Sequence, residues 1–218
     1  MEIKVIKVGA SVFEENEKIA EEVKEFLKNR GIISFNFMGS PGSGKTTILE
    51  RTVSLLKEKY KIGVIEGDIA GSYDAKKFEK FKIPVVQINT GGACHLDANM
   101  VKRGVENLPI EDLEIIFVEN VGNLVCPAEF EIGTGINIVV ISVVEGDDKP
   151  EKYPLMFKIS DICIVNKIDI LKFSDFNPEK FKERVLSVND KIKIFNLSAK
   201  TGENFNQWID FVKNSVGR

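Results

Sequence analysis

A glycine-rich segment directly after an apolar run constrains this chain more than any other feature. Residues 39–47 read GSPGSGKTT and follow the run IISFNFM at 32–38. The segment fits the pattern G-x-x-x-x-G-K-[ST], with Gly39, Gly44, Lys45 and Thr46 in the defined positions. Such a segment joins a buried strand to a helix, and its backbone N–H groups surround phosphate oxygens. The sequence therefore predicts a phosphate-binding loop (P-loop).

Each residue type in this loop has a physical task. The glycines let the backbone approach the β-phosphate closely, and Lys45 neutralises oxygens of the β- and γ-phosphates. The hydroxyl of Thr46 is suited to contact Mg²⁺. We expect nucleotide contacts from the whole loop, namely Gly39, Gly42, Ser43, Gly44, Lys45, Thr46 and Thr47.

Short apolar runs alternate with polar stretches of helical periodicity along the rest of the chain. Runs that are apolar throughout indicate strands covered on both faces. We therefore predict an α/β fold of the P-loop NTPase class, with a mainly parallel twisted sheet flanked by helices on both faces. Strands are expected within 32–38, 62–68, 85–89, 113–120, 136–146, 162–167 and 192–199, and helices at about 46–59, after 95, from about 178 and around 205–212.

Residues 1–31 are expected to form an arm and one amphipathic helix ahead of the sheet. The stretch 1–10 suits an edge strand or an ordered arm, and Ser11 with Glu14 forms a capping-box pattern that begins a helix stopped at Gly31. No internal repeat or Pro/Gly-rich linker marks a boundary. With 218 residues, of which 43% are hydrophobic, we predict one P-loop domain over 1–218 whose core covers 32–218.

A second motif, N-K-x-D at Asn166, Lys167 and Asp169, indicates recognition of guanine. The Asp169 carboxylate is suited to accept hydrogen bonds from guanine N1–H and the 2-amino group, whereas adenine leaves that buried charge unpaired. The motif follows the apolar run ICIV at 162–165. Further along, a segment resembles the S-A-K element of GTPases, whose backbone supports guanine O6, at Ser198, Ala199 and Lys200. The motifs in this order favour GTP over ATP.

Acidic residues after two other strands are candidates for Mg²⁺ and for the attacking water. Asp68 follows IEG, and Asp74 is expected on the same loop, with ordinary solvated acids as the alternative for both. Glu119 and Gly122 resemble a D-x-x-G element with Glu in place of Asp. We expect Mg²⁺ at Thr46, Asp68 and Glu119, and catalytic roles for Lys45, Asp68, Asp74, Glu119 and Gly122.

The element ending at Gly122 lacks the glutamine that positions water in some switch GTPases, because Asn123 stands there instead. No arginine is placed as a finger for the γ-phosphate. We therefore predict slow intrinsic hydrolysis, on the order of 10⁻⁴ to 10⁻² per second.

The third constellation consists of a histidine and two cysteines. His95 is the only histidine of the chain and follows Cys94 directly, while Cys126 lies in ENVGNLVCP. Thiolate and imidazole ligands suit Zn²⁺ or Ni²⁺, whereas Mg²⁺ and Ca²⁺ take oxygen ligands. Three ligands leave a tetrahedral ion one short, so water, an open transfer position or a second subunit completes the set. The alternative is that both cysteines are buried as small hydrophobic residues and that His95 is a capped surface residue. Cys163 is expected in the core.

The short spacing from Gly122 to Cys126 suggests that one loop links nucleotide and metal. We expect GTP binding to move Cys126 against Cys94 and His95, or to press two subunits together so that their ligands converge. Hydrolysis then releases the ion.

These segments together resemble a known family, the GTP-binding hydrogenase nickel-incorporation proteins of the HypB type, in the dimerising class of P-loop GTPases. The resemblance runs over nearly the whole chain from about Ile32, and CHLDA with ENVGNLVCP is its most specific pair. It implies GTP hydrolysis, a nucleotide-dependent homodimer, and delivery of nickel to a hydrogenase precursor with companion maturation proteins. It also implies zinc or nickel at Cys94, His95 and Cys126.

Two further comparisons with that family bear on partners and storage. Asp147, Asp148 and Lys149 match a loop that approaches the partner subunit in this class, with solvated turn residues as the alternative. The amino-terminal stretch carries neither the cysteine-rich nor the histidine-rich motif of some members. We therefore expect any bound metal to use the site in the GTPase domain alone.

Charge and hydropathy exclude several partners. The 30 Lys and Arg balance 33 Asp and Glu for a net charge of −3, with no block of like charge for nucleic acid. The start lacks the apolar core of a signal peptide, and the run INIVVISVV falls short of the ~20 residues of a membrane span. We expect a cytoplasmic protein. The alternatives to a nickel metallochaperone are a urease-type nickel GTPase, a regulatory GTPase with structural zinc, and a small-molecule kinase.

Overall fold

A seven-stranded sheet forms the centre of the structure, a computed structural model that describes residues 9–69, 71 and 73–216. The strand order is β3-β2-β4-β1-β5-β6-β7, and every pair of neighbouring strands is parallel, which confirms the predicted mainly parallel sheet. The strands are β1 (Ile33–Gly39), β2 (Ile62–Asp68), β3 (Val85–Asn89), β4 (Ile115–Glu119), β5 (Ile136–Ser142), β6 (Ile162–Asn166) and β7 (Lys193–Asn196).

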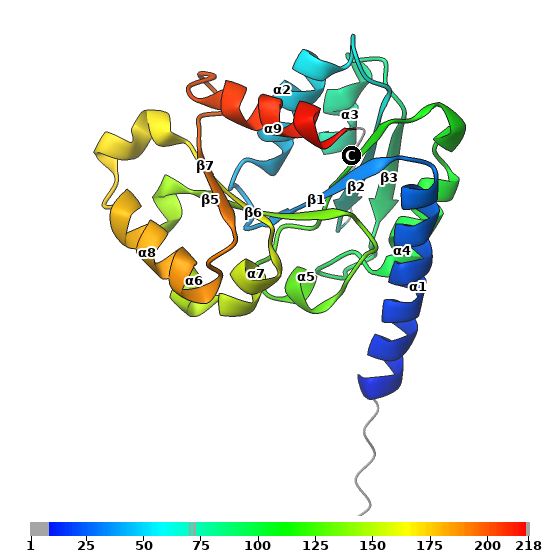
Figure 1. Ribbon diagram of the computed structural model, residues 1–218, viewed down its shortest axis with the longest axis horizontal. Coiled ribbons are helices and arrows are strands. Elements are labelled where there is room, and N and C mark those ends of the chain that lie inside the picture. Colours follow the sequence, from blue (N-terminus) through cyan, green and yellow to red (C-terminus); the bar gives the residue numbers. More distant parts are fainter. Residues whose placement is uncertain (1–8, 70, 72, 217–218) are drawn as a thin grey trace, which may run out of the picture.

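Helices cover both faces of this sheet (Figure 1). Side chains of α2, α3 and α9 pack on one face, and those of α1, α4, α7 and α8 pack on the other. The α-helices are α1 (Gly9–Asn29), α2 (Lys45–Leu56), α3 (Tyr73–Glu79), α4 (Ala98–Glu106), α5 (Cys126–Glu129), α6 (Lys149–Lys152), α7 (Pro154–Ile159), α8 (Pro178–Val188) and α9 (Phe205–Ser215). Short 3-10 turns cover η1 (Ile110–Asp112), η2 (Val143–Glu145) and η3 (Ile168–Phe173).

The core on the α2 and α9 face is built around aromatic rings. Phe35 stacks on Phe117 of the neighbouring strand with ring centroids 5.3 Å apart, and Trp208 of α9 meets Phe35 edge-on at 5.9 Å. The indole N–H of Trp208 donates to the hydroxyl of Thr52 in α2 at 2.9 Å, so this buried polar group is satisfied. This packing holds helix α2, which begins within the P-loop, against the sheet.

The central strands end together at one edge of the sheet, as parallel pairing requires. Phe37 of β1 is in register with Glu119 of β4, and Glu119 is in register with Glu66 of β2. The loops after these strands therefore meet at the same edge, where ligands of such sheets bind.

The amino-terminal helix differs from its prediction. It begins at Gly9, so Ser11 and Glu14 lie inside α1 and the predicted capping box does not start it. It ends at Asn29, and Gly31 follows with a positive φ of 68°, as the sequence indicated. Residues 1–8 of the expected arm or edge strand lie outside the described residues, and residues 9 and 10 belong to α1. No helix of the described part is both long and apolar enough to cross a bilayer.

Candidate nucleotide and metal sites

The P-loop connects β1 to α2 at the carboxyl edge of the sheet. The ammonium of Lys45 is buried and donates to the carbonyl oxygens of Gly39 at 3.2 Å and Ser40 at 3.3 Å, so it turns back over the loop. Gly44 has a φ of 100°, and a Cβ there would lie 2.2 Å from Nδ2 of Asn166. Only glycine fits at this point, because both the backbone conformation and the space exclude a side chain.

The N-K-x-D segment is bonded directly to the P-loop. Asn166 at the end of β6 donates from Nδ2 to the carbonyl of Ser43 at 3.0 Å and accepts at Oδ1 from the N–H of Ala199 at 3.0 Å. Lys167 donates from Nζ to the carbonyl of Gly42 at 2.7 Å. One buried amide thus joins the phosphate loop to the predicted guanine loop.

The expected base-recognition residues also meet. Ser198 donates from Oγ to Oδ1 of Asp169 at 2.6 Å, and the N–H of Thr201 donates to the same hydroxyl at 3.1 Å. Arg51 of α2, which sequence reasoning did not single out, donates from Nη1 to the carbonyl of Ala199 at 3.2 Å. Its signal in the sequence is weak, because an arginine in the middle of an amphipathic helix usually lies on a solvated face.

Two of the predicted Mg²⁺ residues lie together. The hydroxyl of Thr46 donates to Oε1 of Glu119 at 2.8 Å, and the Glu119 side chain is buried at the end of β4. A hydroxyl and a carboxylate in contact next to a phosphate loop are the oxygen ligands that Mg²⁺ takes. The donor chemistry at this point therefore fits the ion.

The other predicted acids are placed differently. Asp68 ends β2, and its carboxylate accepts from the N–H of Ile69. Asp74 was expected on the same loop, but its backbone lies in the first turn of α3. The loop is shorter than expected because a helix begins at Tyr73; the Asp74 side chain lies outside the described residues.

Gly122 packs against the P-loop, and the next residue bonds to it. A Cβ at Gly122 would lie 2.9 Å from Cγ of Pro41. The N–H of Asn123 donates to the carbonyl of Gly39 at 3.0 Å, and its side-chain Nδ2 donates to the carbonyl of Cys94 at 3.4 Å. Asn123 therefore contacts both the phosphate loop and the loop that carries Cys94.

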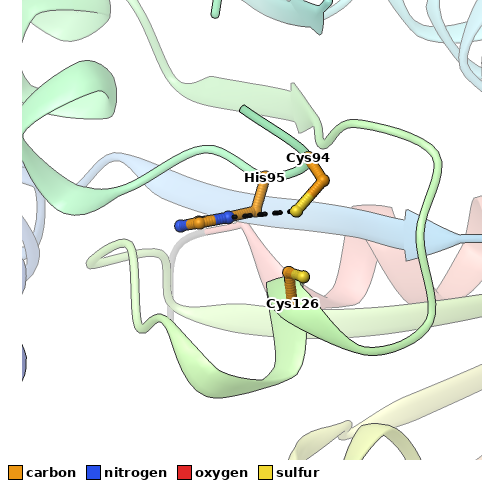
Figure 2. Close-up of side chains that lie close together, drawn as sticks. All are labelled: Cys94, His95 and Cys126. Carbon is orange, nitrogen blue, oxygen red and sulfur yellow. Dashed lines mark hydrogen bonds between the residues drawn. The ribbon is translucent and has the colours of Figure 1, made fainter. Parts of the chain in front are cut away.

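The two cysteines and the histidine converge from distant parts of the chain (Figure 2). Cys94 and His95 lie in the loop between β3 and α4, and Cys126 begins α5. One potential ligand atom from each residue lies within 4.8 Å of the others, and Sγ of Cys94 is 3.8 Å from Nδ1 of His95. Both cysteines are half-buried, whereas Cys163 is fully buried in β6, which confirms its core assignment.

The electrostatic setting favours the neutral forms of Cys126 and His95 before metal binds. The contact with Cys94 and burial raise the pKa of the Cys126 thiol. Burial lowers the pKa of the His95 imidazole, and Asp97 and Glu129 partly offset that effect. A neutral imidazole beside two thiols fits a soft divalent ion, which binds the imidazole as it is and displaces thiol protons.

A buried asparagine that the motifs did not reveal fixes the histidine loop. Asn120 follows β4 and accepts at Oδ1 from the N–H groups of Leu96 and Val121, both at 3.0 Å. Its Nδ2 donates to Asn36 at 3.3 Å. Asn120 lies within ENVGNLVCP, but no role was assigned to it, because a polar residue at the end of an apolar run is common in loops.

The loop matched to a subunit contact is engaged within the chain. The carboxylate of Asp147 pairs with Arg184 of α8 and accepts from the N–H of Asn177 at 3.1 Å. Asp148 forms an ion pair with Lys152 at 2.5 Å. This loop therefore has intramolecular partners in the single chain.

The parallel sheet, the glycine-rich loop and the residues bonded to it define the P-loop class of nucleotide-binding proteins. Residues 34–196 match the family model described as CobW/HypB/UreG, nucleotide-binding domain. The chain belongs to this family and, within it, to the hydrogenase maturation proteins of the HypB type.

Individual relatives match over nearly the full chain. A probable hydrogenase maturation factor HypB of Methanocaldococcus jannaschii is 39% identical over 212 residues, which cover 97% of this chain and 96% of that protein. The crystal structure of HypB from Archaeoglobus fulgidus has 36% identity and a TM-score of 0.87, covering 94% of this chain and 100% of the other. That of Helicobacter pylori HypB in complex with nickel has 37% identity and a TM-score of 0.87, covering 92% and 94%.

Proposed function

We propose that this protein is a GTP-hydrolysing metallochaperone that couples GTP binding and hydrolysis, through homodimerisation, to nickel delivery during maturation of nickel–iron hydrogenase. The observation that carries the proposal is the double engagement of Asn123, which bonds Gly39 of the P-loop and the carbonyl of Cys94. In this proposal the single domain over 1–218 holds both sites. The reduced thiols that it requires are consistent with a cytoplasmic location.

The nucleotide part of the proposal assigns phosphate binding to the P-loop and guanine selection to Asp169. The backbone N–H groups of the loop and Lys45 bind the phosphates, and the Asp169 carboxylate accepts from guanine. Supporting contacts hold the two loops at a fixed spacing through Asn166. The nucleotide contacts are proposed at Gly39, Gly42, Ser43, Gly44, Lys45, Thr46, Thr47, Asn166, Lys167, Asp169, Ser198, Ala199 and Lys200.

The hydrolytic part assigns Mg²⁺ to the paired Thr46 and Glu119. Mg²⁺ bound there supplies charge neutralisation to the β- and γ-phosphates. Asp68 remains a proposed contributor from the adjacent strand end, and Gly122 presents its N–H near the γ-phosphate position. Because Asn123 replaces a water-positioning glutamine, we keep the expectation of slow intrinsic turnover.

The metal part assigns nickel, or zinc in competition, to Cys94, His95 and Cys126. Two cysteine sulfur atoms and an imidazole nitrogen lie within 4.8 Å of one another, and these ligand types match the preference of both ions. These three residues leave a coordination position free for water, for transfer to an acceptor, or for a second copy of the chain. A hydrogenase precursor or a companion maturation protein is the proposed acceptor.

The coupling step follows from the chain between the two sites. A γ-phosphate next to Gly122 is expected to shift the segment 122–126, which carries Asn123 and ends at Cys126. That shift changes the spacing of Cys126 from the Cys94 loop, and hydrolysis reverses it.

The experiment is an equilibrium titration with Ni²⁺ and with Zn²⁺ in the GDP state and with a non-hydrolysable GTP analogue, read together with mass from gel filtration. We expect a dimer with the analogue and a metal affinity or stoichiometry that differs between the two states. Identical metal binding and identical mass in both states would end the coupling proposal. A Cys94→Ser variant in the same series reports whether the measured ion binds at this site.

A further inference from the structure

The geometry points to helix α1 as the element that positions the metal ligands, through Asn16 and through a ring stack that runs from Phe13 over Phe130 to His95. This inference rests on the proposed metal site and adds residues that lie outside the segments CHLDA and ENVGNLVCP. It assigns these side chains a positioning role, since none of them is a proposed ligand.

The ring stack is the first observation. The ring of Phe130 lies on the imidazole of His95 with centroids 4.0 Å apart and an interplanar angle of 26°. The ring of Phe13 in α1 lies 5.0 Å from Phe130 at 35°. Stacking covers one face of the imidazole and leaves its ring nitrogens free at the edge, where Nδ1 faces Sγ of Cys94 at 3.8 Å. The imidazole plane is therefore set by Phe130, which follows α5 directly.

The second observation is independent of the rings. Asn16 is buried in α1, and its amide bonds both segments that carry ligands. Its Nδ2 donates to the carbonyl of Glu131 at 2.8 Å, just after α5, and its Oδ1 accepts from the N–H of Ala98 at 2.9 Å, at the start of α4. Ala98 lies just after His95 in the chain, and Glu131 lies just after the helix that begins at Cys126. One side chain thus fixes the separation of the two segments.

Helix α1 is itself held in place by packing against α4. It lies beside α4 (Figure 1), and buried Val23 and Leu27 pack in the same cluster as Val101 and Val105 of α4. Its position is therefore set by its apolar face, and Asn16 and Phe13 transmit that position to the ligand loops. Partners that orient metal ligands without binding the ion typically change affinity by about 10- to 100-fold when removed.

The test uses the full chain and Co²⁺ as a spectroscopic probe, with Ni²⁺ titrations in parallel. Asn16→Ala and Phe130→Leu are expected to weaken Co²⁺ and Ni²⁺ binding by about 10- to 100-fold and to alter the Co²⁺ ligand-field bands. The affinity for the GTP analogue is expected to stay within about twofold. Phe130→Tyr, which keeps the ring, is expected to restore the wild-type spectrum and affinity.

Two matched controls separate this role from general stability. Phe13 and Phe26 lie on the same helix with exposed fractions of 39% and 36%, but Phe26 lies about 20 Å further along the helix axis and contacts Arg30. Phe13→Leu is therefore expected to change the Co²⁺ spectrum and Phe26→Leu to leave it unchanged. Asn107→Ala removes an exposed amide bonded to the Arg103 carbonyl and serves as the control for Asn16.

The outcomes are distinct. Wild-type Co²⁺ affinity and spectrum in Asn16→Ala, Phe130→Leu and Phe13→Leu would overturn the inference, as would an equal loss of GTP affinity and melting temperature in all of them. If wild type binds no Co²⁺ or Ni²⁺, or if Cys94→Ser binds as wild type does, the proposed metal site itself fails. Should Asn16→Ala not fold, the pair Phe13→Leu and Phe26→Leu still decides.

Discussion

The nucleotide region and the metal region are held together in different ways. In the nucleotide region the motif residues bond to one another: Asn166 contacts both Ser43 and Ala199, and Lys167 contacts Gly42. In the metal region the three candidate ligands contact one another weakly: Sγ of Cys94 lies 3.8 Å from Nδ1 of His95, and Cys94 also contacts the Cys126 thiol. Asn120 and Asn123, which lie within ENVGNLVCP, bond the loop that carries Cys94 and His95, but Asn16 and Phe130 lie outside the motifs. The first site is thus assembled by its own motif residues, and the second depends in addition on residues that surround it.

The largest expected effect breaks the nucleotide side alone. Asp169→Asn removes the carboxylate that is proposed to accept from guanine N1–H and the 2-amino group. Two hydrogen bonds to a charged group, each about 1.5–3 kcal/mol, correspond to about a 10²- to 10⁴-fold loss of GTP affinity. Xanthine nucleotide is expected to bind the variant better than GTP does. Competition binding with both nucleotides measures the change.

Metal affinity of Asp169→Asn should remain that of wild type, because its contact to Ser198 lies in another loop. Asp210→Asn, which alters an exposed acid paired with Lys213, is the control. Unchanged GTP preference in Asp169→Asn would remove the guanine assignment from this motif.

The next largest effect breaks the metal side alone. Cys94→Ser replaces the proposed sulfur ligand by a hydroxyl, which binds soft ions poorly. We expect a loss of Ni²⁺ and Zn²⁺ affinity of at least about 100-fold, beyond the range for outer contacts, with GTP affinity unchanged. Cys163→Ala is the control thiol, because Cys163 is buried in β6. Equal metal affinity in the two variants would contradict the ligand assignment; dialysis with metal analysis measures both.

The unequal assembly of the two sites explains what the sequence could and could not predict. The strand at 62–68 and the strand at 85–89 were predicted with their observed bounds, since short runs rich in apolar residues between polar stretches mark strands, although the edge strand β3 is only half-buried. The start of α1 at Gly9 was missed, because the capping box at Ser11 is a local pattern that the helix overrode. The short helices α5, α6 and α7 were also missed, since each spans too few residues for a helical period to register.

The same argument applies within the sites. Asn166 and Lys45 were predictable because their motifs fix both residue type and spacing, and the residues they contact belong to motifs too. Asn16 and Phe130 were not, because an asparagine in an amphipathic helix and a phenylalanine after a short helix carry no spacing signal. The two hydrogen bonds of Asn16 join residues separated by 115 and 82 positions, and only the folded chain brings those together.

A smaller expected effect is the pH dependence of metal affinity, which concerns the metal region alone. Metal binding requires thiolates, and the pKa of Cys126 is raised, so its thiol is protonated at neutral pH and the proton must leave. Each proton released makes the affinity for Zn²⁺ rise by up to about tenfold per pH unit below the thiol pKa. His95, with its lowered pKa, is neutral there and releases none. We therefore expect Zn²⁺ affinity to rise between pH 6.5 and 8.

The measurement is a chelator-competition titration across that range, with proton release followed in weak buffer. Cys126→Ser is the control, since it removes one titrating thiol and should reduce the slope by about one proton per ion. A slope that is flat in wild type, or equal in the two proteins, would contradict the role of Cys126 as a thiolate ligand.

The smallest effect asks how far the nucleotide site depends on a residue outside its motifs, as the metal site does. Arg51 donates from Nη1 to the carbonyl of Ala199 at 3.2 Å, and a Cβ at Gly202 would lie 2.1 Å from its Nη2, so the guanidinium sits against the loop 198–202. Lysine keeps the charge but lacks the planar fork. Loss of one such bond, about 0.5–1.5 kcal/mol, predicts a GTP affinity about 2- to 10-fold weaker in Arg51→Lys. A fluorescence titration with GTP measures the change.

The control is Arg30→Lys, at the remote pair with Glu111, which should bind GTP as wild type does in the same titration. A loss in Arg51→Lys as large as that in Asp169→Asn would mean that the guanine loop, like the metal loops, is positioned mainly from outside, and the contrast between the two regions would disappear.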